Sequence, residues 1–279
     1  MKSPYKIAVL ITLFTSSFIT SQIRLKGNKA VTMENRNISD FNKIEVIDNV
    51  TVELSYNDNQ NVQVKTDSNL QNAILTEVID GVLTIKTSAK IIRKKELTIF
   101  INVNKNLKEL YAYNNAKILS KNVLNIDSIT INAFDKSDYS IKLNSKFVQL
   151  ITKKTSDARI EVLCDKIFIR SEENSEIKCA VNSKFSFIEI LDRSSINIMG
   201  NSTELSFEAS GNSSFRGRDF KCLNVEARTA NNTKTYINAD ETINICATNS
   251  SEIYLYSNPK ITLLEFFDKA SLHKRDLDN

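Results

Sequence analysis

Apolar and polar residues alternate along the chain in short runs that polar clusters interrupt at regular intervals. In the clearest example, 242–259, an apolar residue stands at every second position on both sides of a polar corner at 249–251. A period of two residues that stops at Asn and Ser is typical of a strand, a sharp turn and a second strand. The same pattern recurs upstream, which indicates a repeat protein.

From Leu107 the corners recur about every 19 residues, a spacing within the range of solenoid repeats. The apolar residue expected after each corner is Ile118, Ile141, Ile160, Ile177, Ile196, Phe215, Tyr236, Ile253 or Leu272. One repeat is too short to bury a core, but repeats stacked about 4.8 Å apart share one. We therefore predict an all-β fold over 107–272, a parallel β-solenoid that is right-handed like most parallel crossovers.

Before each corner we expect three inward positions, of which the third tends to be small because the chain bends sharply there. The assigned triplets are Ile129/Ile131/Ala133, Val148/Leu150/Thr152, Ile167/Ile169/Ser171, Leu205/Phe207/Ala209 and Leu223/Val225/Ala227. The register of the rung that ends at Ile196 is ambiguous, since 187–191 contains four apolar residues.

The corners themselves consist of Asn, Ser and Asp, which tolerate left-handed backbone or bond to their own main chain. The corner pairs are Asn114-Asn115, Ser137-Asp138, Ser156-Asp157, Asn174-Ser175, Ser194-Ser195, Ser213-Ser214, Asn231-Asn232 and Ser250-Ser251. Stacked rungs would place like residues in ladders that satisfy one another.

Residues 28–106 lack the regular repeat and predict an irregular N-terminal β cap. Asn57–Gln60 resembles a hairpin connection, and Asp80-Gly81 predicts a tight turn. The stretch Leu70–Val78 fits either a helical turn or an irregular strand. At the opposite end, the residues from Phe266 onward are candidates to close the solenoid.

The first 21 residues have the order of a secretory signal peptide. Met1–Lys6 is basic, Ile7–Phe14 is apolar, and Thr15–Ser21 is small and polar, so we expect cleavage near Ser21 and a single mature domain at 22–279. No stretch approaches ~18 consecutive apolar residues, so we expect no transmembrane span. These features predict an exported protein of the periplasm, the outer-membrane surface or the extracellular space.

Charge and composition exclude some classes of partner. The 279 residues carry a net charge of +4, of which Lys2 and Lys6 lie in the predicted leader. That balance is too even to predict either nucleic acid or an anionic membrane as a partner. The basic run Arg93–Lys95 could bind a polyanion, but it is short and Glu96 closes it, so we favour a solvated loop.

Four cysteines lie in this exported chain, at Cys164, Cys179, Cys222 and Cys246. Two disulfides are one interpretation. Buried free thiols are the other, and we favour it because Cys164 and Cys179 fall on consecutive repeats about two positions out of register. No Cys-x-x-Cys pair or Cys/His cluster predicts a metal site.

Residues for catalysis are scarce, and we predict no catalytic residue, cofactor or metal. The only histidine, His273, lies in a charged tail. A glycan-active enzyme is the alternative, because Asp135, Asp138 and Asp157 could supply the two carboxylates of glycoside hydrolysis. Solvated corner acids explain them more simply, and the chain has no Trp to form a sugar platform.

A contact surface is the remaining candidate site. Tyr254 and Tyr256 alternate with apolar residues and should therefore lie on the outer face, where exposed tyrosines can mark a binding surface. Packing on the strand surface explains them equally well. With the corner acids Asp138 and Asp157 they are the predicted contact residues.

Several segments resemble the head GIN domain family of bacterial adhesins. The segments that carry the resemblance are Ile38–Val46, Val50–Leu54, Val62–Leu70, Thr76–Ile85 and Ile253–Pro259. They span nearly the whole mature chain, although Asn, Ser, Asp and Lys replace the Gly-Ser-Gly-like corners of the family. The resemblance implies an exported, solenoid-like protein of the Gram-negative envelope, with adhesion as its role and no established enzymatic activity.

Together these features predict a non-catalytic exported binding or adhesion module of the cell envelope. Its partner would be an unknown glycan or protein, and its oligomeric state is open. A glycan-active enzyme and a purely structural envelope protein are the alternatives.

Overall fold

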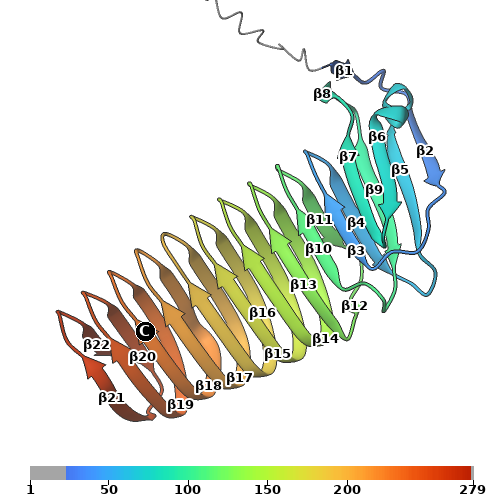
Figure 1. Ribbon diagram of the computed structural model, residues 1–279. Coiled ribbons are helices and arrows are strands. Elements are labelled where there is room, and N and C mark those ends of the chain that lie inside the picture. The colour runs from blue at the N-terminus through green and yellow to red at the C-terminus, as the bar shows by residue number, and fades with distance from the viewer. Residues whose placement is uncertain (1–22, 278–279) are drawn as a thin grey trace, which may run out of the picture.

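The computed structural model describes residues 23–277, so the predicted signal peptide lies outside the described residues. The predicted all-β parallel β-solenoid is confirmed, with about nine stacked turns (Figure 1). Its rungs consist of β10 (Glu109–Ala112), β11 (Lys117–Ser120), β12 (Leu124–Asn125), β13 (Ser128–Ala133), β14 (Asp138–Thr152), β15 (Asp157–Ser171), β16 (Glu176–Ile190), β17 (Ser195–Ala209), β18 (Ser214–Thr229), β19 (Lys234–Ala247), β20 (Glu252–Tyr256), β21 (Lys260–Phe266) and β22 (Ser271–Lys274).

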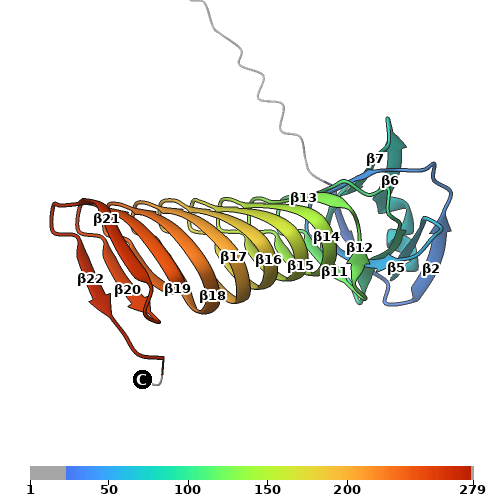
Figure 2. The same cartoon turned by 90° about the horizontal axis from the view of Figure 1, so that it is seen from below.

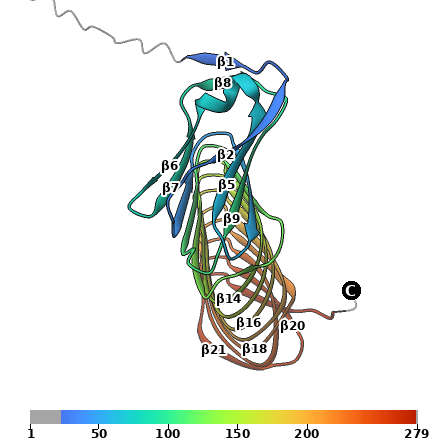
Figure 3. The same ribbon diagram turned by 90° about the vertical axis from the view of Figure 1, so that its right-hand side faces the viewer.

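Each long strand contributes to both sides of a flattened coil (Figures 2 and 3). The first half of β14 pairs with β11 and the second half with β13, in parallel. We call the column of first halves the first sheet and the column of second halves the second sheet. A wide bend joins the halves of one rung, and a tight corner joins successive rungs. Asp138 pairs with Asp157 and Asp157 with Glu176, which sets a period of 19 residues.

Side chains that point into the coil stack in columns. Ile141 lies over Ile160 in neighbouring rungs. Ile177, in contrast, stacks on Ala158 and Ile196, two positions earlier in the rung. The predicted single column of Ile141, Ile160 and Ile177 is therefore wrong in register, although all three side chains are buried.

The register error comes from the first inward position after each corner, which is not always a large aliphatic residue. Tyr139 and Ala158 occupy it in two rungs, and Thr235 rather than Tyr236 occupies it further on. Tyr139 is fully buried, and its hydroxyl donates to the carbonyl oxygen of Asn132 at 3.0 Å. Because inward positions recur every two residues, alternation alone does not distinguish neighbouring columns.

The tight corners contain the expected left-handed residues, at φ values of 55° and 67° for Asn114 and Asn115. In most later corners the left-handed residues lie one or two positions before the predicted pair, as in Lys154 and Thr155. The predicted hydroxyl residues follow the turn and point inward because their short side chains fit the narrow corner. They form a column of buried hydroxyls at Ser137, Ser156, Ser175, Ser194, Ser213 and Ser251.

The inner face of the second sheet follows the predicted triplets with two corrections. The inward residues of β18 are Val225, Ala227 and Thr229, whereas Leu223 is exposed. The ambiguous rung places Ser186 inward together with Ile188 and Ile190. Strand β18 contains one extra residue, so its second half follows that of β17 after 20 residues instead of 19.

The N-terminal cap contains nine strands and one short 3-10 helix. These elements are β1 (Arg24–Lys26), β2 (Val31–Arg36), β3 (Lys43–Val46), β4 (Thr51–Tyr56), β5 (Asn61–Asp67), η1 (Ser68–Ala73), β6 (Ile74–Ile79), β7 (Val82–Thr87), β8 (Lys90–Arg93) and β9 (Leu97–Val103). Strands β3 and β4 pair in parallel with β10 and β11, so the stacking begins before Leu107.

The connections in the cap resolve three local predictions. The turn at Asp80-Gly81 is confirmed, because β6 and β7 pair antiparallel across it. The segment Leu70–Val78 contains the end of η1 followed by β6, so both interpretations hold in part. Asn57–Gln60 is not a hairpin connection, because β4 and β5 do not pair with each other. Strand β9 lies between them and pairs with both.

At the C-terminal end, the last rung leaves its inner face open. Ile261 and Leu263 of β21 stack on Ile243 and Ile245 but remain 44% and 50% exposed. Phe266 and Leu272 pack against the core but Phe267 is exposed, so the residues from Phe266 onward close this end only in part. Residues 23–277 contain no helix that is long and apolar enough to cross a membrane.

Candidate functional site

The predicted acids Asp138 and Asp157 lie together on the outer face of the first sheet. They occupy the first position of their rungs, and Glu176 continues the column. At one end of this column Lys117 Nζ lies 3.5 Å from Asp138 Oδ2, and at the other end Lys178 Nζ lies 2.9 Å from Glu176 Oε1. Strand pairing thus brings three carboxylates side by side, and the sequence analysis did not assign Glu176 to the group.

Asp157 stands in the middle of this acid column. Partial burial raises its pKa, and the charges of Glu176 and Asp138 raise it further. Neither Asp138 nor Asp157 lines the grooves described below. The two acids therefore do not face each other across a cleft, as glycoside hydrolysis would require.

The predicted tyrosines separate in the structure. Tyr254 lies on the outer face of the first sheet, stacked between Tyr236 and His273 with ring centroids 4.8 and 5.0 Å away. Its neighbours cover both faces of its ring, so only the edge is available to a ligand. Tyr256 is 6% exposed, which contradicts its assignment to the contact surface. It follows the buried Leu255 directly, because the alternation of β20 ends there.

A groove of about 370 Å³ lies on the outer face of the second sheet, between rungs β16 and β19. One outward column consists of Phe185, Glu204, Asn224 and Thr242, and the adjacent column of Phe187, Ser206, Glu226 and Asn244. Phe185 is 41% exposed, and the small Ser206 leaves the space between the larger side chains. We call this site the phenylalanine groove.

Two free carboxylates lie in the phenylalanine groove. Among residues 23–277, neither Glu204 nor Glu226 forms an ion pair. Thr242 donates to the Oδ1 atom of Asn224 at 2.6 Å and thereby orients that amide. The groove was not predicted from the sequence, because the four apolar residues at 187–191 leave the register of β16 ambiguous. The 19-residue spacing from Ile167 to Ser186 was the signal that could have fixed it.

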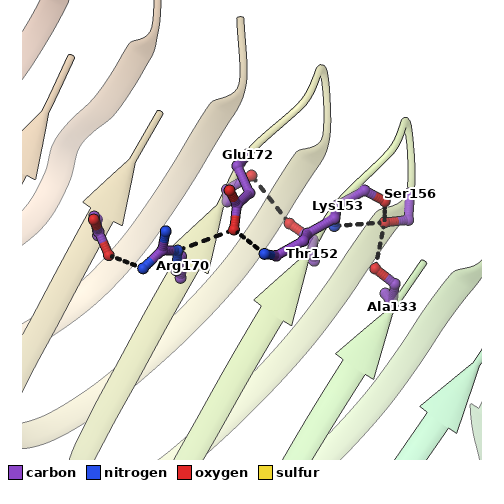
Figure 4. A network of polar contacts seen from close by, with 8 residues as sticks. Ala133, Thr152, Lys153, Ser156, Arg170 and Glu172 are labelled. Carbon is purple, nitrogen blue, oxygen red and sulfur yellow. Dashed lines mark hydrogen bonds and ion pairs between the residues drawn. The ribbon is translucent and has the colours of Figure 1, made fainter. Parts of the chain in front are cut away.

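A polar network on the second sheet shows the opposite arrangement, with its charges fully paired (Figure 4). Glu172 Oε1 lies 2.6 Å from Lys153 Nζ and 3.0 Å from Arg170 Nε, and Arg170 also contacts Glu189 at 3.1 Å. Burial opposes ionisation of Glu172, but hydrogen bonds from Lys153 and Arg170 outweigh it and lower the pKa of Glu172. The hydroxyl of Ser156 accepts from the Lys153 N–H at 3.1 Å. This network holds adjacent rungs together and leaves no group free for a ligand.

A second groove, of about 570 Å³, follows the wide bend. Amides form a ladder there, away from the tight corners where ladders were predicted: Asn144 donates to Asn125 at 3.2 Å, and Asn201 donates to Asn182 at 2.7 Å. Leu163 interrupts the ladder between Asn144 and Asn182. These amides bond to one another along the stack, which satisfies part of their hydrogen-bonding capacity without a ligand.

Metal and thiol chemistry have little support within residues 23–277. No group of three or more His, Cys, Asp or Glu residues in this part of the chain could hold a metal ion. All four cysteines are free, as favoured from the sequence. Cys179 pairs with Ile160, so it lies four positions out of register with Cys164 instead of the predicted two. Burial raises the pKa of Cys222 to about 12 and, with the charge of Asp165, that of Cys164 to about 11. Thiols of this kind are weak nucleophiles at neutral pH.

Comparison with known proteins gives one family match and several structural neighbours. The family described as "Putative auto-transporter adhesin, head GIN domain" matches residues 40–178 and 160–259. No curated protein matches the chain. Each of three solved structures is similar in fold at 18% sequence identity or less.

Two of these structures are putative adhesins of Parabacteroides. The adhesin from Parabacteroides merdae ATCC 43184 is 17% identical, with a TM-score of 0.64 over 90% of this chain and 99% of that one. The adhesin from Parabacteroides distasonis ATCC 8503 is 17% identical and has a TM-score of 0.69. The match covers 91% of this chain and 100% of that one. A putative lipid binding protein from the latter organism is 18% identical, with a TM-score of 0.58 over 90% and 97%.

Proposed function

The chain belongs to the head GIN domain family of putative auto-transporter adhesins, and from this premise we propose that it is a non-catalytic, exported binding module of the bacterial cell envelope. The order of residues 1–21 supports export through a signal peptide. The stacked rungs support a binding role, because they present two long outer faces on a rigid frame.

The phenylalanine groove is the observation that carries this proposal. Aromatic rings beside free hydrogen-bonding groups are the combination that sugars need, since the C–H face of a sugar packs on a ring while its hydroxyls bond to amides and carboxylates. Phe185 and Phe187 provide the rings, and Glu204, Glu226 and Asn244 provide the polar groups. We propose a glycan without acidic groups as the ligand, because the two carboxylates would repel an anionic one.

A bound lipid inside the coil is the less favourable alternative. The inward columns of both sheets consist of buried side chains that form one hydrophobic core. An acyl chain would have to displace them, at the cost of close packing. A ligand of this protein should therefore bind on the outer faces.

A glycan array with purified protein tests the proposal. We expect binding to neutral glycans and at least a tenfold loss in the double variant Phe185→Ala/Phe187→Ala. The matched control is Phe168→Ala, which pairs with Phe187 in the same outward column but lies outside the groove; its affinity should change less than twofold. Equal losses in the two variants, or no binding by the unmodified protein, would contradict a role for this groove.

A glycan-cleaving enzyme is the second candidate, because Glu204 and Glu226 lie one rung apart in adjacent columns of the same groove. Two carboxylates across a bound sugar are the groups that glycoside hydrolysis requires. We expect no new reducing ends when the protein is incubated with the glycan that it binds. Release that disappears in Glu204→Gln and Glu226→Gln would replace the non-catalytic proposal with this one.

A further inference from the structure

Two short strands, β1 and β8, form a ribbon at one edge of the cap (Figures 1 and 3). Strand β1 pairs in parallel with β8, so that Arg24 lies opposite Lys90 and Lys26 opposite Arg93. These four side chains are exposed. Because the two strands are more than 60 positions apart in the chain, only folding brings their charges together.

The charges of this ribbon and its loops have no acidic partners. Among residues 23–277, seven neighbouring cations form no ion pair. They are Arg24, Lys26, Lys29, Lys90, Arg93, Lys94 and Lys95. These seven cations exceed the net charge of the whole chain, which is +4, so the overall charge balance does not describe this surface.

The nearby acids are engaged elsewhere. Glu96, which closes the basic run in the sequence, turns away to Lys65 at 2.9 Å. Asp67 is fully buried, and its carboxylate accepts the Lys95 N–H at 2.7 Å. Asp48 accepts from the hydroxyl of Thr87 at 2.9 Å. The prediction of a solvated loop at Arg93–Lys95 relied on Glu96, and the structure removes that support.

Two large apolar side chains project from the same ribbon. Ile92 is the extra residue of a bulge in β8, between Ile91 opposite Leu25 and Arg93 opposite Lys26, and it is 56% exposed. Ile23 precedes β1 and is 67% exposed. Exposed isoleucine costs free energy in water, and a soluble polyanion offers nothing to cover it. A bilayer surface accommodates both kinds of side chain, because phosphates attract the cations and the acyl boundary takes the apolar groups.

We propose that the β1–β8 ribbon docks the protein on an anionic lipid bilayer. Basic residues on the ribbon meet the lipid phosphates, while Ile23 and Ile92 enter the interface. The groove of about 610 Å³ between β8 and the tight corner at Asn114 and Asn115 is lined by three of these cations, Lys90, Arg93 and Lys94, and extends this surface with amide groups. This role is independent of ligand binding in the phenylalanine groove.

Vesicle flotation tests the proposal with purified protein. We expect binding to vesicles of equal parts phosphatidylglycerol and phosphatidylcholine, and none to phosphatidylcholine alone. The triple variant Arg24→Gln/Lys90→Gln/Arg93→Gln should bind about 100-fold more weakly, because each basic residue near an anionic surface contributes about fivefold in affinity. Its matched control is Lys105→Gln/Lys121→Gln/Lys136→Gln, which removes the same charge from exposed positions outside the ribbon and should bind within twofold of the unmodified protein.

A second variant separates a bilayer from other polyanions. Ile23→Ser/Ile92→Ser should lower vesicle binding while leaving the weak attraction to soluble dextran sulfate unchanged. Equal loss of vesicle binding in the ribbon and control triple variants would overturn the proposal. Binding to dextran sulfate as tight as to vesicles, with no effect of the isoleucine change, would also overturn it. Circular dichroism of each variant confirms that it is folded.

Discussion

At the N-terminal end of the solenoid, the inward residues Leu83 and Ile99 are fully buried, whereas at the C-terminal end Ile261 and Leu263 are about half exposed. The N-terminal end owes its burial to strands that leave the repeat. Antiparallel β2, β5 and β6 pair beside the parallel rungs, and η1 packs next to them. At the C-terminal end, β21 pairs only with β19 within residues 23–277, so one of its edges is unpaired there.

This difference shows that a repeat defines the interior of a solenoid but not its ends. Each inner rung is covered because its neighbours have the same sequence pattern, so one pattern suffices for all of them. An end rung needs a different sequence to cover its core and its strand edge. Within residues 23–277, only the segment before Leu107 covers its end completely. The two ends should therefore respond differently to the same substitution.

The largest expected difference between the ends comes from a buried charge. Ile99 lies between Val52 and Val64, so Ile99→Asp should destabilise the fold by more than about 4 kcal/mol because the new carboxylate has no partner. Leu263→Asp is the matched change at the open end and should cost at most about 1 kcal/mol, because water reaches that side chain. Urea unfolding at neutral pH measures both. Similar losses would mean that the open end is covered in solution.

A smaller effect concerns the attachment of β1 to the cap. Burial opposes the charge on Asp67, but N–H donors of Lys95, Lys29 and Glu96 outweigh it and lower the pKa of Asp67. Gly27 permits this contact, because a Cβ atom there would lie 2.6 Å from the Asp67 carboxyl carbon. The ionised Asp67 carboxylate therefore stabilises the folded state above its unfolded-state pKa of about 3.9. This contribution disappears as the pH falls through the lower pKa that Asp67 has in the folded protein.

Asp67→Asn should therefore lower the urea midpoint at pH 7 and flatten its decline between pH 5 and pH 2. No carboxylate is buried in the C-terminal rungs as far as residue 277, so this acid sensitivity should arise in the cap. Asp58→Asn, an exposed change in the loop between β4 and β5, is the control and should leave the curve unchanged. A variant at Asp67 with the pH profile of the unmodified protein would show that the contact contributes no stability.

The sequence predicts the solenoid because period-two alternation and polar corners repeat in every rung and point to one answer. It could not fix the register at Tyr139 and Ala158, since inward positions two residues apart look alike. It also misassigned Tyr256, because a strand end changes which face a side chain takes. In each case the sequence shows which residues alternate within a strand, but not how neighbouring rungs align.

Sites that depend on pairing between distant segments were beyond the sequence for the same reason. Glu204 and Glu226 become neighbours only through the rung register. Arg24 and Lys90 become neighbours only when β1 crosses to β8. The acid pair Asp138 and Asp157 could be anticipated, because both follow equivalent corners one repeat apart.

The smallest expected effect on stability comes from the acid column of Asp138, Asp157 and Glu176. This column lies between the two ends of the solenoid, so a substitution there should be independent of both. Burial and its neighbours Glu176 and Asp138 raise the pKa of Asp157, so its charge costs stability above the unfolded-state pKa. Asp157→Asn should therefore stabilise the protein at pH 7 by about 0.2–0.5 kcal/mol, since like charges directly opposite each other are destabilising and solvent screens them. Asp165→Asn, which loses a contact to Lys184 at 2.8 Å, should bring no gain. Urea midpoints measured at pH 7 and pH 3 test this prediction. The stability gain of Asp157→Asn should vanish at pH 3, where the carboxylate is protonated. A gain that persists at pH 3 would rule out charge repulsion as its source.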